Sequence, residues 1–107
     1  MTWYETIIAC HQAVTDKVSH YGRMKSERYF VWQEDGDTAL NTDNRREIRA
    51  VTGSTDLFTK TEFDPWCEQF EKALNDAGVS WRRNPSQYEE ETGIIHHEWD
   101  WQVPLTG

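Results

Sequence analysis

The second half of the chain carries the order of elements that most limits the possible fold. Residues 51–59 are rich in β-branched and aromatic side chains, which favour a strand. Asp64 and Pro65 then have the residue types preferred at a helix N-cap and at the first helical position. Gly78 has the type preferred just beyond a helix end. Because residues 79–103 follow as two further strand-like runs, the pattern indicates an α+β domain.

The final runs, residues 79–89 and 94–103, predict a hairpin. Residues 91–93 supply the turn, since Gly93 can adopt a positive φ. Pro85 makes the first of these runs an edge strand or a bulged strand. Strict alternation of apolar and polar residues in the last strand predicts one buried face and one wet, solvent-exposed face. The predicted buried face carries Ile95, His97, Trp99, Trp101 and Val103, and the wet face carries His96, Glu98, Asp100 and Gln102.

Two helices are predicted, one at each side of the central strands. Thr2 and Glu5 fit a capping box, and Gly22 is a plausible stop for the helix that follows. Its apolar stripe consists of Trp3, Ile7, Cys10, Val14 and Val18. The inward stripe of the second helix consists of Trp66, Phe70, Leu74 and Ala77, with Cys67 beside it.

The central region predicts strands joined by a long connection. Residues 28–34 read as a strand, and residues 34–46 read as an exposed loop because they are rich in turn residues. Residues 48–60 read as a second strand or strand pair, in which Gly53 is a candidate bulge. We therefore expect one α+β domain over residues 1–107, with two helices packed on one face of a mainly antiparallel sheet of about four to five strands.

Large rings must supply most of the core. Only 36% of the 107 residues are hydrophobic, but the chain has six Trp, four Tyr and four Phe, and each ring buries about 150–250 Å². Trp66 and Trp81 are assigned to the core, whereas Trp32 and Trp101 fit either the core or a subunit interface. Residues 29–32 are apolar on both faces of their strand, which is typical of a central strand or of one that faces another chain.

The formal charge of −8 limits the partners. Lys and Arg neutralise phosphates when proteins bind nucleic acids or anionic lipids, so we expect no specific nucleic-acid binding and no membrane binding. No run approaches the ~20 apolar residues of a membrane span, and the N-terminus lacks the basic start of a secretory signal. Cys10 and Cys67 have no metal-type spacing, which indicates free thiols in a reducing compartment.

The sequence offers one weak candidate for a metal or catalytic site, which is the polar face of the last strand. His96, Glu98 and Asp100 are metal-ligand types, but alternate strand positions spread them over about 13 Å. A solvent-facing row accounts for them equally well. Since no catalytic constellation stands out, we expect no enzyme activity, no catalytic residues, no cofactor and no metal. Two alternatives stay open: a metal-dependent enzyme that uses His96 and Glu98, and a small acidic adaptor that binds a basic host protein.

Four segments resemble small structural proteins of tailed bacteriophages and prophages. The segments are residues 51–60, 77–81, 88–93 and 94–103. This group comprises minor capsid, tail-completion and tail-terminator proteins, which are short α+β proteins. The resemblance implies a virion structural protein at the tail end or head–tail junction, found in the virion and, during assembly, in the host cytoplasm. Terminator and head–tail joining roles both remain open.

The same resemblance implies a ring of copies, possibly a hexamer, around a passage for DNA. The partners would be other copies of the chain and tail-tube or connector proteins. An acidic lumen would let DNA slide without adhering, because like charges repel. The candidate subunit-interface residues are Tyr29, Val31, Trp32, Trp99, Trp101 and Val103. The candidate acidic residues of the rim or lumen are Glu34, Asp35 and Asp37 in the first loop and Glu89, Glu90 and Glu91 at the hairpin tip.

Overall fold

The chain folds into two helices and a five-stranded mixed sheet in the computed structural model. The structure describes residues 1–42 and 45–105, and it describes their side chains except over 37–49. In chain order the elements are α1 (Trp3–Gln12), β1 (Val18–His20), β2 (Tyr29–Thr42), β3 (Arg45–Thr59), α2 (Pro65–Asp76), β4 (Ser80–Glu89) and β5 (Ile94–Pro104). The α+β class predicted from the sequence is confirmed.

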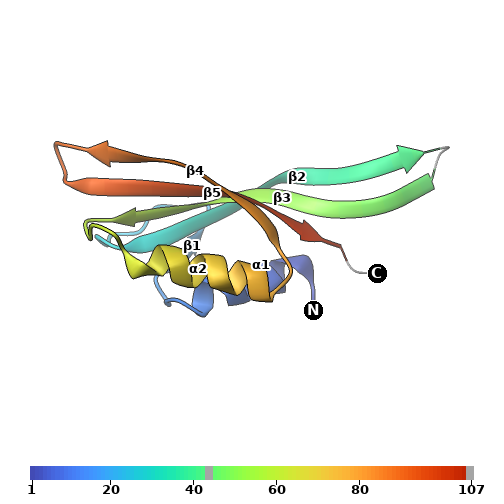
Figure 1. Cartoon of the computed structure of the whole chain (residues 1–107), viewed down its shortest axis with the longest axis horizontal. Coiled ribbons are helices and arrows are strands. Elements are labelled where there is room, and N and C mark those ends of the chain that lie inside the picture. Colours follow the sequence, from blue (N-terminus) through green and yellow to red (C-terminus); the bar gives the residue numbers. More distant parts are fainter. Residues whose placement is uncertain (43–44, 106–107) are drawn as a thin grey trace.

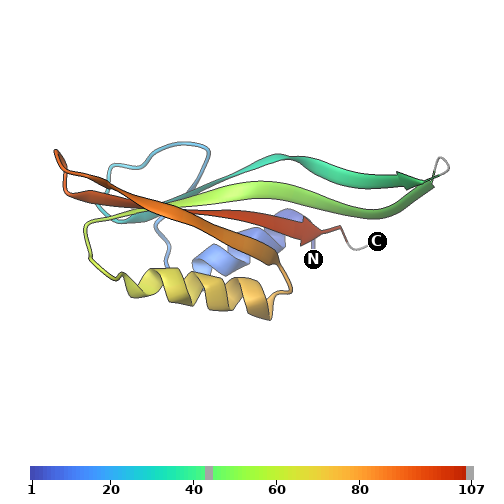
Figure 2. The ribbon, with the colours of Figure 1, turned by 45° about the horizontal axis from the view of Figure 1, so that its top comes forward.

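The strands lie in the order β1-β2-β3-β5-β4. β1 runs parallel to β2, and the other pairings are antiparallel. Both helices cover the same side of the sheet (Figure 1). The segment between β1 and β2 passes over the opposite side (Figure 2). β4 forms an edge, and its register shifts between Asn84 and Gln87, where Pro85 predicts an irregularity.

The molecule is elongated because its two hairpins point in opposite directions (Figure 1). Its principal extents are 52 × 23 × 22 Å. The pairing of β3 with β5 ends at Ala50 and Pro104, whereas β2 and β3 stay paired out to Thr42 and Arg45. The end of the β2–β3 hairpin therefore projects beyond the helices as a two-stranded arm. We call residues 38–42 and 45–50 the arm.

The prediction that the first helix continues through Val18 to Gly22 is wrong. α1 ends at Gln12, with Ala13 as its C-cap. The amides of Val14 and Thr15 both donate to the carbonyl of His11, and the chain then turns into β1. Val14 and Val18 still pack against the core from outside the helix. Both residues are apolar because they pack against the core, and their helix-like spacing does not mean that they belong to a helix.

The prediction of an exposed loop over residues 34–46 is also wrong, since most of this stretch extends β2 and begins β3. Glu34 pairs with Gly53 and Gly36 pairs with Thr52, so Asp35 is an extra residue in β2. This arrangement is a β-bulge, for which turn-type residues are also favoured. The predicted bulge therefore exists, but on the strand that faces Gly53.

The predicted ends of the second helix, α2, are confirmed. Asp64 caps the N-terminus by accepting from the Trp66 amide, and Pro65 follows it. At the other end Gly78 has φ +74°. The Val79 amide donates to the Leu74 carbonyl over 2.9 Å, which gives the predicted Schellman geometry together with the bond from Gly78 to Asn75. In the predicted stripe Phe70 and Leu74 are buried and Trp66 is partly buried, but Ala77 is exposed because it is the C-cap.

The core lies between the helices and the sheet and consists mainly of rings. Trp99, Phe30 and Phe70 have no exposed surface. At its centre the ring of Trp101 lies directly over Gly53, its cross-strand partner. A Cβ at position 53 would lie 2.3 Å from Cη2 of Trp101 and 2.5 Å from the Gln33 carbonyl oxygen. Glycine is therefore needed at this position to leave room for the indole.

A buried polar chain crosses the same region. His11 is fully buried, and its Nδ1 donates to the Ile7 carbonyl over 2.7 Å. Because that proton occupies Nδ1, Nε2 of the neutral ring accepts from the Thr55 hydroxyl over 2.9 Å. The same hydroxyl oxygen accepts from Nε1 of Trp101. Burial lowers the pKa of His11 to about 4, so the ring stays neutral at pH 7.

We predict that Gly53→Ala destabilises the fold by about 1–3 kcal/mol, because the new methyl group must displace either the Trp101 ring or backbone. Urea denaturation measures the change. Gly22→Ala is the matched control: its Cβ would have only the Ser19 hydroxyl oxygen nearby, at 3.9 Å. Equal effects of the two substitutions would refute the packing account.

We predict that the His11 ring stays neutral, with its proton on Nδ1, at every pH above about 5. Its pKa is lower in the folded than in the unfolded chain, so its contribution to stability is complete above pH 6.5 and is lost as the pH falls toward about 4. Ring ¹⁵N chemical shifts across a pH titration report both tautomer and charge. An imidazolium signal from folded protein at pH 6 would contradict the network.

Candidate functional site

The predicted interface residues lie in the core of one chain. Trp32, Trp99, Trp101 and Val103 are at most 4% exposed and face the helices. Tyr29 and Val31 lie on the other face and are also buried, at 6% and 7% exposure. Their role in a subunit contact stays a prediction, but their side chains first of all stabilise the single chain.

The helix-free face of the sheet carries a ladder of polar pairs. Nε2 of His96 lies 2.7 Å from Oδ1 of Asp56 on the neighbouring strand. Asn84 donates to both Glu98 and Asp100, over 2.9 and 3.1 Å. These cross-strand pairs account for the alternating polar residues of β5 without a ligand. Among the described residues, no group of three or more His, Cys, Asp or Glu could hold a metal ion. His96 and Glu98 bond instead to different partners, Asp56 and Asn84.

The two predicted groups of acidic residues lie far apart. Glu34 and Asp35 belong to β2, where Glu34 contacts His20 over 2.7 Å and Asp35 accepts from the Thr52 hydroxyl over 2.7 Å. The side chain of Asp37 is outside the described residues.

The other acidic group lies at the tip of the β4–β5 hairpin. Glu89, Glu90 and Glu91 are all exposed there. Glu34 pairs with Gly53, which pairs in turn with Trp101 of β5, whereas Glu89 pairs with Ile94. Trp101 and Ile94 are seven residues apart along β5. At ~3.3 Å per residue this places the groups about 23 Å apart along the strand direction. One chain thus presents two separate acidic surfaces.

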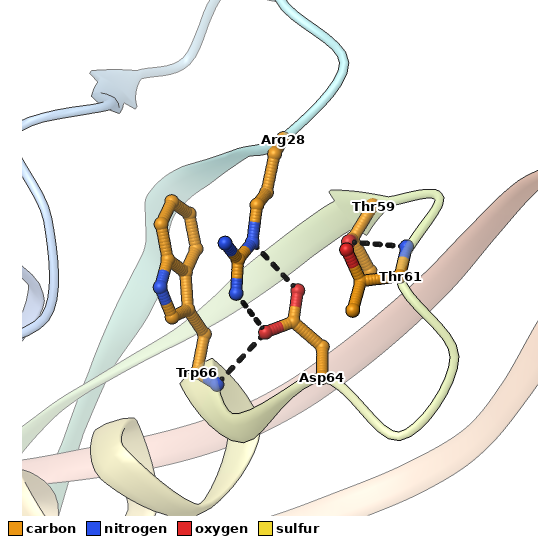
Figure 3. Close-up of polar contacts among 5 residues, drawn as sticks. All are labelled: Arg28, Thr59, Thr61, Asp64 and Trp66. Carbon is orange, nitrogen blue, oxygen red and sulfur yellow. Dashed lines mark hydrogen bonds and ion pairs between the residues drawn. The ribbon is translucent and has the colours of Figure 1, made fainter.

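An ion pair between the partly exposed Arg28 and the buried carboxylate of Asp64 fixes the start of α2 to the segment before β2 (Figure 3). Nε of Arg28 donates to Oδ2 of Asp64 over 2.9 Å, and Nη2 donates to Oδ1. The guanidinium carbon also lies 3.8 Å from the centre of the Trp66 ring. Burial alone would raise the pKa of Asp64, but the bonds from Arg28 and from the Trp66 amide lower it below its ordinary value. The sequence indicated the cap at Asp64 and gave no sign of Arg28, which is 36 positions away.

A groove of about 530 Å³ lies beside this ion pair. Its wall includes His97, which is 9% exposed and whose Nδ1 lies 2.7 Å from the Ser86 hydroxyl. Nε2 of His97 is the one buried side-chain N or O atom without a hydrogen-bond partner in the described part of the chain. Burial, with help from the positive charge of Arg83, lowers the pKa of His97. Phe63, at the rim, has φ +52° and is 90% exposed.

A second groove, of about 430 Å³, was not predicted from the sequence. It lies between α1 and the β1–β2 pair, and Trp3, Tyr4, His20 and Trp32 contribute rings to it. Among the described residues that line it, Glu34 is the acidic one. The signal in the sequence was the aromatic pair at the start of α1, but only the fold brings this pair beside β2. We call this the aromatic groove.

Comparisons with known proteins find a match in structure. No protein-family model and no curated protein matches the chain. A chain of the solved structure described as the virion of a native gene transfer agent particle has a similar fold, with a TM-score of 0.63 at 12% sequence identity. The match covers 99% of this chain and 92% of that chain. The chain therefore shares its fold, over nearly its whole length, with a component of that virion. Neither described helix is long and apolar enough to cross a membrane.

We predict that Asp64→Asn lowers the free energy of unfolding by about 1–3 kcal/mol at pH 7, because Asn still caps α2 but leaves the Arg28 charge unpaired. The folded pKa of Asp64 is lowered, so its contribution is present above the ordinary value of 3.8 and is lost as the pH falls below it. The difference from wild type should therefore shrink at pH 2. Denaturation at both pH values measures it.

Asp76→Asn is the control for this prediction, because Asp76 makes an exposed pair with Lys72 within α2. It should change stability by less than about 0.5 kcal/mol. An Asp64→Asn variant as stable as wild type at pH 7 would show that the ion pair contributes nothing.

Proposed function

We propose that this chain is a structural protein of a phage-like virion. The observation that carries the proposal is the fold shared with a chain of the gene transfer agent virion, which extends over 99% of one chain and 92% of the other. A match that omits little of either chain favours a similar structural role over a domain reused in a larger, unrelated protein.

We further propose that the chain acts as a ring of copies at the tail end or head–tail junction. The arm supports this step. Two-stranded hairpins are marginally stable by themselves in water, and exposed strand edges are templates for pairing with another chain. An arm that extends beyond the sheet's other strands is therefore suited to a contact with a neighbouring copy or a tail-tube protein. The buried residues 29–32, with Trp99, Trp101 and Val103 of β5, would then support the arm from inside the subunit.

The net charge is consistent with a passage for DNA. Six copies at −8 each would carry about −48. Because DNA phosphates are repelled by such a surface, DNA could pass without being held. Glu34 and Asp35 on β2, and Glu89–Glu91 on the hairpin tip, are the acidic groups we propose for the rim or lumen.

Sedimentation velocity tests this function directly. Purified protein is measured alone and with tail tubes of the particle to which it belongs. We predict that it forms a closed oligomer or binds to the tubes, and that a variant with a shortened arm does neither. Thr38 pairs with Ala50 across the hairpin, so an Asn-Gly turn that joins these two residues should close it without disturbing the core.

Far-UV circular dichroism and thermal unfolding serve as controls for folding of the shortened variant. A wild-type chain that stays monomeric and ignores tail tubes would contradict the proposed function. Association that disappears at high salt and occurs equally with any basic protein would favour the acidic-adaptor alternative instead.

A further inference from the structure

The aromatic groove is lined by rings that lie nearly perpendicular to one another. The rings of Trp3 and Tyr4 meet edge to face, with centroids 5.5 Å apart and an interplanar angle of 88°. Trp3 and Trp32 meet in the same way, at 6.4 Å and 86°. Trp3 is partly buried and Tyr4 is exposed, so these rings are accessible from solvent. A groove lined by rings in such contacts presents both ring edges and electron-rich ring faces to whatever enters it.

A stack of three rings, two of which line the groove, lies beside it. His20 lies between Tyr21 and Trp32, with centroid distances of 3.8 and 3.9 Å. Tyr21 has φ +75°, a conformation that a residue with a bulky side chain rarely adopts. Its amide donates to the Trp32 carbonyl over 3.0 Å and so holds this turn. A strained backbone that fixes a ring stack is typical of a built site.

The carboxylate of Glu34 gives the aromatic groove a negative charge. Glu34 is partly exposed, at 31% of its side chain, and its Oε1 lies 2.7 Å from Nε2 of His20. The His20 hydrogen bond, and to a smaller extent the Tyr21 hydroxyl, lower the pKa of Glu34, so that it is ionised at neutral pH. None of the eight described lining residues is Lys or Arg. The aromatic groove therefore combines ring faces with a fixed negative charge.

We propose that the aromatic groove binds the cationic head of an arginine or lysine side chain presented by a partner protein. Guanidinium and ammonium groups are attracted both to the faces of Trp and Tyr and to a carboxylate. An anionic group would be repelled by Glu34. A neutral apolar group would fill the groove but would offer the Glu34 carboxylate no partner beyond its bond to His20, while it displaces water from that charge, which is unfavourable.

The groove is large enough for this occupant. Its volume of about 430 Å³ exceeds what one side chain needs, so the aliphatic stem can pack on Ile8 and Val18 while the head meets the rings. The net charge of −8 would also speed the approach of a basic partner. The proposal concerns this groove alone and holds whether or not the chain forms a ring.

The test is an NMR titration of the intact protein, with the indole Nε1–H signals of Trp3 and Trp32 as reporters. The ligands are the acetylated, amidated derivatives of arginine, of citrulline, which is its neutral isostere, and of norleucine, which is apolar. We expect arginine to shift both signals saturably, with a dissociation constant on the order of 1–10 mM. Citrulline and norleucine should bind at least roughly fivefold more weakly.

Two matched variants identify the charge that matters. Glu34→Gln should weaken arginine binding by roughly fivefold, because the carboxylate is lost while the shape is kept. Glu27→Gln removes an equal charge from an exposed site that pairs with Lys60, and it should leave the affinity unchanged. Circular dichroism checks that both variants fold.

Three outcomes would overturn the proposal. The first is equal affinity for arginine and citrulline, which would exclude a charge-selective site. The second is tighter binding of norleucine, which would make the groove an apolar site. The third is an equal loss in the two variants, which would reduce the effect to the general charge of the protein.

Discussion

The packing of the Trp101 indole on Gly53 is the constraint on which the rest of the fold depends. It brings β3 and β5 together at a position where a side chain on β3 would be in the way. The same indole donates to Thr55, which is bound in turn to His11 of α1. One aromatic residue thus fixes the sheet and the position of the first helix. Because every polar atom of this chain of bonds has a partner, its burial is not penalised.

Much of the second half was predictable because its signals are local. The ends of α2 depend on Asp64, Pro65 and Gly78, and each acts within a few residues of itself. The alternation along β5 is equally local and correctly separated the buried Trp99 from the ladder residue His96. In such segments the residue types and the final fold agree.

The errors arose where one sequence pattern has two structural causes. Asp35 and Gly36 suit a turn, but they also suit a β-bulge, and only the register with β3 distinguishes the two. Val14 and Val18 are spaced as in a helix, yet they reach the core from a turn and a strand. The bond from Arg28 to Asp64 and the aromatic groove join residues far apart in the chain, so no local pattern could indicate them.

The fold separates a rigid core from the surfaces that we assign to partners. The rings that were candidates for subunit contacts are buried, although Trp32 also lines the aromatic groove; the arm and the exposed side of that groove are the surfaces open to partners. The most direct measurement is electron cryomicroscopy of tail tubes incubated with the purified protein. We predict a closed ring of copies at the tube end, with each arm against the next subunit. Bare tube ends, or single copies bound without contact to one another, would contradict it.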